Sequence, residues 1–236
     1  MLPVKRTGRG SSLLVIGAVL LLTVRAGAVE PPSKIRLGTS GPELYVFGWS
    51  QDGKFAYALV DQPPFRGGYG FFCAIVDART DQVLWSLYAH SDQFDWQGPD
   101  APLVPAWDRN VSMLNEQFAE FGVEPVSTAR IEPLPLQQGT DEYTAVVNEW
   151  RVNPETSPYG NGVVGYTLFL RSRERGSKVI AQRAHIFTTD INVVGYMASP
   201  FEDRIVVVVA ESGNAYGNTR FTDFTVIGAH LEAGFE

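Results

Sequence analysis

The fold of this chain is decided by residues 48–57, which read Gly-Trp-Ser-Gln-Asp-Gly-Lys-Phe-Ala-Tyr. The pair Asp52-Gly53 is a strong signal for a tight hairpin turn when apolar runs flank it on both sides. Such runs are present, because Leu44 to Ser50 precedes the pair and Phe55 to Asp61 follows it. The sequence therefore predicts two antiparallel strands joined by this turn.

Further strands are expected on both sides of one helical segment. After Asp108, apolar residues recur every three or four positions, which is the spacing of one helix face. We expect a helix at about 108–121, with Asp108 as its N-cap. Residues 90–106 are expected to form a loop, and residues 124–141, which are rich in proline, a connecting segment.

The remaining strands follow from short apolar runs bounded by turn residues. Residues 205–209 are all apolar and do not alternate with polar residues, so this strand is expected to be buried on both faces. The fold class is therefore mainly β, with antiparallel sheets and one amphipathic helix. The other expected strands are 71–77, 83–89, 143–152, 163–171, 178–188, 193–198 and 221–229.

A second segment, residues 195–206, repeats the order of the first: a Gly-aromatic pair, a serine and a polar turn before an apolar strand. Residues 48–57 resemble the blade motif of WD40-like, TolB-type β-propellers, and the whole chain is similar to uncharacterised, predicted secreted bacterial proteins that carry this motif. The resemblance implies a blade-like hairpin with a packed aromatic, and the motif holds no catalytic residue. A closed propeller needs about four blades, whereas a helix and proline-rich segments occupy the middle of this chain. We expect blade-like sheets that pack together without closing a ring.

The first thirty residues have the layout of a secretory signal peptide. A basic start is followed by an apolar run from Leu13 to Val24 and by small residues, Ala26-Gly27-Ala28. We expect cleavage between Ala28 and Val29, and a location in the periplasm or outside the cell. The alternative is an uncleaved membrane anchor, which needs about 20 apolar residues, more than this run offers.

After cleavage, the chain would be strongly acidic. Residues 1–28 hold four basic side chains and no acidic ones, which leaves 208 residues with 15 basic and 26 acidic side chains, a formal charge of −11. Such a surface repels phosphate backbones and acidic lipids, so nucleic acid is excluded as an expected partner. We expect a flexible arm at 29–42 and one β-rich domain at 43–236. Two blade-like halves, 43–90 and 142–236, are the alternative division.

Motifs for catalysis, metals or cofactors are missing from the sequence. Cys73, the only cysteine, lies in an expected buried strand and is interpreted as a core residue. The three histidines are scattered without the spacing of a zinc site. Residues 160–165 fit G-x-G-x-x-G but lead into a strand and not a helix, so we interpret them as a glycine turn. We therefore expect no catalytic residue, metal or cofactor.

Aromatic side chains near glycine-rich loops are the best remaining candidates for a ligand-binding site, because binding residues are frequent on loops. The residues proposed as ligand contacts are Phe65, Tyr69, Trp96 and Tyr159. The strand tryptophans, Trp49, Trp85 and Trp150, are instead expected in the core.

The leading hypothesis is an exported, non-enzymatic binding or scaffolding protein for a protein or glycan ligand. The alternatives are an extracytoplasmic hydrolase acting on carbohydrate or peptidoglycan and, more weakly, a subunit of an envelope complex. A pair of partly buried carboxyl groups about 5–10 Å apart in one cleft would favour the hydrolase.

Overall fold

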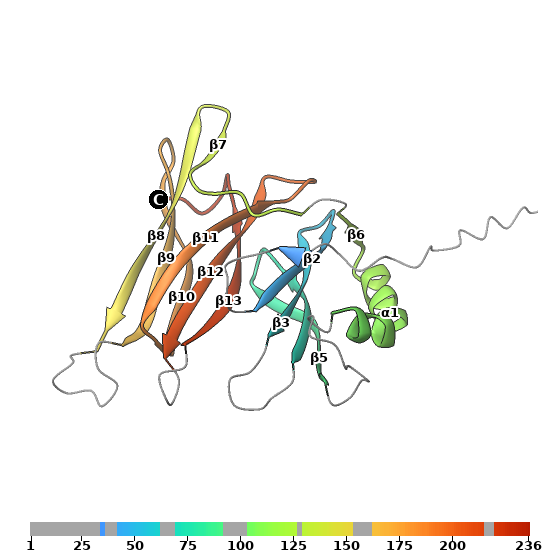
Figure 1. Cartoon of the computed structure of the whole chain (residues 1–236). Helices are drawn as coiled ribbons and strands as arrows, with labels where there is room; N and C mark the ends of the chain where they lie inside the picture. Colours follow the sequence, from blue (N-terminus) through green and yellow to red (C-terminus); the bar gives the residue numbers. More distant parts are fainter. Residues whose placement is uncertain are drawn as a thin grey trace, which may run out of the picture.

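The computed structural model describes residues 34–35, 42–61, 69–91, 103–126, 129–152, 162–214 and 220–236. Within them, the chain forms three antiparallel sheets and one helix (Figure 1). The helix-side sheet holds β1 (Lys34–Ile35), β2 (Glu43–Ser50), β3 (Lys54–Asp61), β4 (Gly70–Asp77), β5 (Gln82–His90) and β6 (Val123–Pro125). The middle sheet holds β11 (Asp190–Ala198), β12 (Arg204–Asn214) and β13 (Arg220–His230). The outer sheet holds β7 (Leu136–Gln138), β8 (Asp141–Arg151), β9 (Val163–Ser172) and β10 (Gly176–Thr188).

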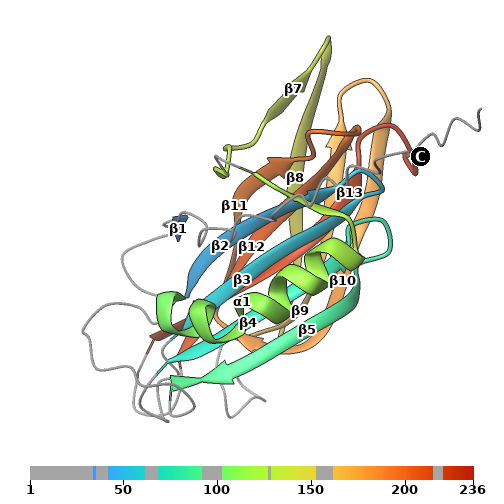
Figure 2. The same cartoon turned by 90° about the vertical axis from the view of Figure 1, so that its right-hand side faces the viewer.

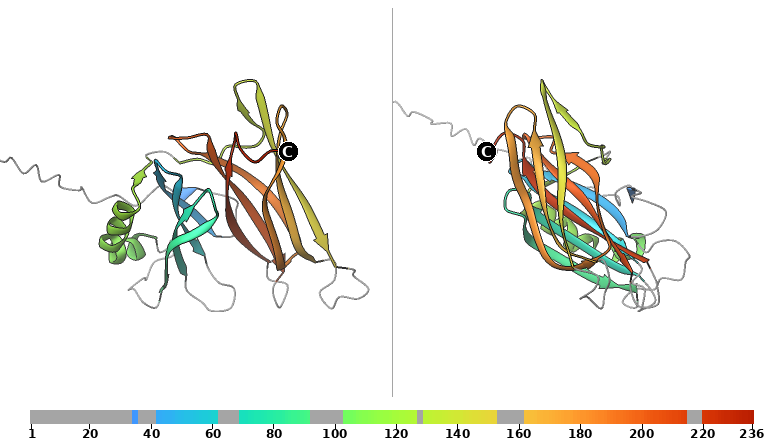
Figure 3. Two further views of the ribbon diagram at one scale, coloured as in Figure 1. Left: turned by 180° about the vertical axis from the view of Figure 1, so that it is seen from behind. Right: turned by 90° about the vertical axis from the view of Figure 1, so that its left-hand side faces the viewer.

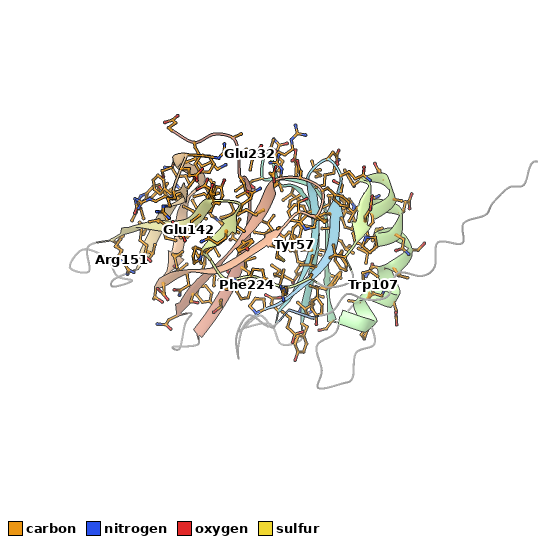
Figure 4. All side chains as sticks on the ribbon, turned by 90° about the horizontal axis from the view of Figure 1, so that it is seen from above. Tyr57, Trp107, Glu142, Arg151, Phe224 and Glu232 are labelled. Atoms are coloured by element: carbon orange, nitrogen blue, oxygen red, sulfur yellow. The ribbon has the colours of Figure 1, made fainter. Side chains whose placement is uncertain are left out.

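The helix and the sheets are stacked as four layers. Helix α1 (Leu103–Glu120) covers one face of the helix-side sheet, whose other face packs on the middle sheet, and the outer sheet closes the stack (Figures 1 and 2). Each interface has its own apolar core. In the view from above, Trp107 lies on the helix, and Tyr57 and Phe224 lie where the helix-side and middle sheets meet (Figure 4). The prediction of blade-like antiparallel sheets without a closed propeller is confirmed.

Strand β12 is the centre of the stack. Its even-numbered residues Val206 and Val208 belong to the core shared with the helix-side sheet. The odd-numbered Ile205, Val207 and Val209 belong to the core shared with the outer sheet. All five are fully buried, because successive side chains of a strand point to opposite faces and both faces are covered here. The strand predicted to be buried on both faces is therefore confirmed.

The motif at residues 48–57 folds into the hairpin between β2 and β3. Ser50 Oγ accepts a hydrogen bond from the Lys54 backbone N–H at 2.8 Å and donates one to Asp52 Oδ1 at 2.6 Å. The buried Trp49 ring packs 4.7 Å from the ring of Phe55, centroid to centroid. The side chains of this motif thus serve the local structure of the turn and the packing of the core.

The second segment of the repeat has a matching geometry. The register of β2 shifts between Val46 and Gly48, and that of β11 shifts between Val193 and Gly195, so each Gly-aromatic pair follows a bulge. A Cβ on Gly48 would collide with the backbone of Glu124, and one on Gly195 with that of Glu132. The backbone therefore passes directly over Gly48 at Glu124 and directly over Gly195 at Glu132.

Two expectations about the middle of the chain are wrong. The helix begins at Leu103 and not near Asp108, so part of the expected loop 90–106 is helical and Asp108 is not the N-cap. The expected connecting segment 124–141 contains the short strands β6 and β7. The reason for the early helix start is tertiary: Trp107 is buried and stacks 5.2 Å from Phe47.

Candidate functional site

Strand ends from all three sheets lie at one end of the stack, here called the loop end (Figures 1 and 3). In the helix-side sheet, Asp61, Gly70 and His90 lie side by side in register. In the other two sheets, the junction between β10 and β11 lies at this end, where the Thr189 backbone N–H donates to Ser212 O at 2.7 Å.

Three of the four aromatic residues proposed as ligand contacts lie outside the described residues: Phe65, Trp96 and Tyr159. The residues of the expected cleavage site, Ala28 and Val29, also lie outside them. Tyr69 is described. It is half-buried and packs against the core beneath α1. Its backbone N–H donates to Ser91 Oγ at 2.9 Å, and its backbone carbonyl accepts from the Ser91 N–H at 2.9 Å. These contacts fix the start of β4 beside the end of β5.

Two carboxyl groups with raised pKa values lie at the loop end, on the half-buried Asp61 and the exposed Asp223. Asp61 ends β3, and a Cβ built on Gly70 would lie 2.6 Å from Asp61 Oδ1 and 3.1 Å from the Tyr88 hydroxyl, so both groups occupy the space above this glycine. Burial raises the pKa of Asp61, and the charge of Asp223 raises it further. Burial also raises the pKa of Asp223, with Glu211 adding to the effect and Arg183 opposing it. The two aspartates therefore favour their protonated forms more than exposed carboxyl groups do.

Glu211 ties the middle sheet to the outer sheet just inside the loop end. Its Oε1 accepts hydrogen bonds from the Tyr166 hydroxyl at 3.0 Å and the Thr225 hydroxyl at 3.1 Å. Arg183 Nη1 lies 3.1 Å from the same oxygen. Because the Glu211 side chain is buried, these three donors compensate for its lost hydration. Its role is structural.

The outer sheet presents a face that no described element covers (Figure 1). Residues such as Ala145 and Val147 point from β8 into the core. Trp150 lies on the opposite face, and 37% of it is exposed. The expectation that Trp150 is a core residue is therefore wrong, whereas Trp49 is buried and Trp85 is partly buried against the core under α1. The reason is parity, since an even-numbered residue of β8 faces away from the middle sheet.

The Trp150 ring lies directly on the backbone of β9. Trp150 pairs with Gly165, and a Cβ on that glycine would lie 2.9 Å from Cζ3 of the indole. Glycine thus lets one side of the ring rest on the sheet while another part remains exposed. The register places a polar row beside it, Asn148, Thr167 and Gln182, and then an apolar row, Val146, Phe169 and Val179.

We call these eight residues the Trp150 face: Val146, Asn148, Trp150, Gly165, Thr167, Phe169, Val179 and Gln182. None of the eight is charged. Asn148 and Gln182 are exposed, and Thr167 is half-exposed, so amide and hydroxyl groups accompany the aromatic ring at the surface. Period-two alternation along 141–151 could have shown which residues share this face. The pairing of Trp150 with Gly165 could not be found in the same way, because it depends on register.

Other kinds of site receive no support in the described part of the chain. It contains no group of three or more His, Cys, Asp or Glu that could hold a metal ion. No helix among the described residues is long and apolar enough to cross a membrane. Cys73 is a buried core residue, as expected, and burial raises the pKa of its thiol, so the reactive thiolate is disfavoured.

Comparison with known proteins adds no relative: no family model, curated protein or solved structure matches the chain.

Proposed function

We propose that this protein is an exported, non-enzymatic binding protein that recognises carbohydrate through the Trp150 face. The observation that carries the proposal is the Trp150 indole, which rests on Gly165 and is partly exposed on an open sheet face. The basic start and apolar run of the first thirty residues support export to the periplasm or beyond.

The chemistry of the Trp150 face suits a neutral, hydroxylated ligand. A sugar ring has an apolar face of C–H groups, which can pack on the π-face of an indole, while its hydroxyls require donors and acceptors nearby. The amide side chains of Asn148 and Gln182 provide both, and the Thr167 hydroxyl lies between them in register. Bases also stack on aromatic rings, but a nucleic acid would meet the excess of acidic side chains.

Titration of Trp150→Ala with soluble oligosaccharides tests this proposal. The probes are hexasaccharides of glucose and of N-acetylglucosamine, and isothermal titration calorimetry measures their binding. Co-sedimentation of the protein with insoluble peptidoglycan is a second assay. Loss of the ring should weaken binding at least about tenfold, or about 1.4 kcal/mol. Phe201→Ala is the matched control, because Phe201 is 40% exposed but lies in the turn before β12.

The control variant should bind as the unmodified protein does. Gly165→Ala should also weaken binding, because a Cβ there would lie 2.4 Å from the indole and 2.7 Å from the Arg183 backbone carbonyl. Circular dichroism of this variant checks that the sheet is kept. Binding that is unchanged in Trp150→Ala, or absent for every probe at millimolar concentration, would contradict the proposal.

A hydrolase is the second candidate, and one observation favours it. Asp61 is half-buried, and the charge of the exposed Asp223 adds to the burial that raises the pKa of Asp61, as a general acid beside a second carboxylate requires. If this pair is catalytic, Asp61→Asn and Asp223→Asn should each lower the release of reducing ends from the same hexasaccharides by at least about a hundredfold. Trp150→Ala should then act mainly on KM. Absence of turnover in the unmodified protein leaves the binding function as the conclusion.

A further inference from the structure

Strand β5 forms one edge of the helix-side sheet and carries exposed apolar side chains. It pairs with β4 along one side, and no described strand pairs with its other side. Figure 2 shows it as the outermost strand of that sheet, with α1 lying over the sheet face. Val83 and Tyr88 are each 56% exposed, and Leu84 is 37% exposed. An edge of this kind presents backbone N–H and C=O groups that can pair with another strand.

The other long edge strands carry features that oppose such pairing. Strand β10 contains Lys178 and Arg183, and its register is irregular at two points. Strand β11 is bulged before Gly195, and Glu132 already pairs with Tyr196 in it. Strand β13 contains Asp223 near its start. Charges and bulges are the usual protection of an edge.

Strand β5 lacks one of these protections, the charged side chains. Its nine residues, Gln-Val-Leu-Trp-Ser-Leu-Tyr-Ala-His, include no Asp, Glu, Lys or Arg, although the chain as a whole is acidic. It is bulged at Leu84, because Ile75 pairs with Trp85 and Val76 with Val83. The absence of charge, and not the absence of a bulge, therefore distinguishes β5 from the other long edge strands. A charge-free strand in an acidic protein can meet a second copy of itself without bringing like charges together.

We propose that β5 pairs antiparallel with β5 of a second copy of this chain, with the two-fold axis at Ser86. This register places Leu84 opposite Tyr88 of the partner copy, so that an exposed apolar side chain of each copy meets one of the other. Trp85 then lies opposite Leu87, and both of these side chains are partly buried against the core under α1. A two-fold axis makes the contact self-complementary and closed at two chains. The pairing continues the helix-side sheet of one copy into that of the other.

Opposite charges at position 86 test both the pairing and its register. Ser86 is exposed, so neither Ser86→Lys nor Ser86→Glu should disturb the fold of one chain. Sedimentation-velocity ultracentrifugation of the unmodified protein should show the mass of two chains. Each variant alone should sediment as one chain, because like charges then lie opposite each other at the axis. An equimolar mixture of the two variants should recover the mass of two chains.

The matched control is Val179→Lys, which adds the same charge to an exposed apolar position of another edge strand, β10. This variant should sediment as two chains. Circular dichroism and the urea midpoint should be the same for all variants at a concentration where each is monomeric. A single-chain mass for the unmodified protein, persistence of the pair in Ser86→Lys, or no recovery in the mixture would each overturn the proposal.

Discussion

Asp223 shows how a single carboxyl group ties stability to pH, although this residue is exposed. Burial and the nearby charge of Glu211 raise its pKa above the ordinary 3.8. The folded protein therefore binds more protons than the unfolded chain between pH 3.8 and the raised pKa. The contribution of Asp223 to stability is consequently most favourable below this window and is lost as the pH rises through it. Asp61, whose pKa is also raised, adds a contribution of the same sign.

Replacement of Asp223 by Asn should remove this dependence. At neutral pH, we expect Asp223→Asn to have a higher urea midpoint than the unmodified protein, because a neutral amide loses less hydration than a carboxylate and is not repelled by Glu211. The difference should shrink towards zero as the pH falls to about 3.5, where the unmodified side chain is mostly protonated in both states. Denaturation curves from pH 3.5 to 7 measure it, with the exposed Asp108→Asn as a control. A gain in stability that grows towards acid pH would contradict the assignment.

At the scale of elements, strands were easier to predict than the helix because their ends coincide with turn residues. The sequence predicts a strand at 55–61, and β3 is Lys54–Asp61, since Asp52-Gly53 marks where the chain reverses. The sequence does not indicate the helix start, because Pro105 is typical of a loop as well as of the first turn of a helix. Pro105 is the third residue of α1, where the missing N–H has no partner within the helix. The burial of Trp107, which fixes this turn of the helix, was not visible in the local pattern.

The two candidate surfaces illustrate the same limit for sites. The alternation of β8 and the charge-free composition of β5 are properties of the sequence, so both could be seen in advance. The Trp150 ring and Gly165 are 15 positions apart and meet only because of the β8–β9 register, which shifts just beyond Trp150. Likewise, Asp61 and Asp223 come from different sheets. Contacts of this kind depend on how sheets pair and stack, which neither composition nor spacing determines.

At the scale of the whole molecule, β12 joins the two halves of the stack into one structure. Val208 faces the core shared with the helix-side sheet, and Val207 faces the core shared with the outer sheet. Neither core can lose its β12 residues without weakening the strand that the other core also needs. A molecule built in this way should unfold as one cooperative unit, although its sequence contains two blade-like segments.

Truncation of either valine tests this cooperativity. Both Val207→Ala and Val208→Ala should lower the free energy of unfolding by about 2 kcal/mol, because each removes fully buried methyl groups and leaves a cavity. In both variants, tryptophan fluorescence and far-ultraviolet circular dichroism should follow a single urea transition with the same midpoint. Val179→Ala, at a position 54% exposed, should change stability by no more than about 0.5 kcal/mol. If Val207→Ala instead unfolded the outer sheet at a lower urea concentration than the helix-side sheet, the two transitions would separate. The chain would then consist of two independently stable halves, and the central role given to β12 would be wrong.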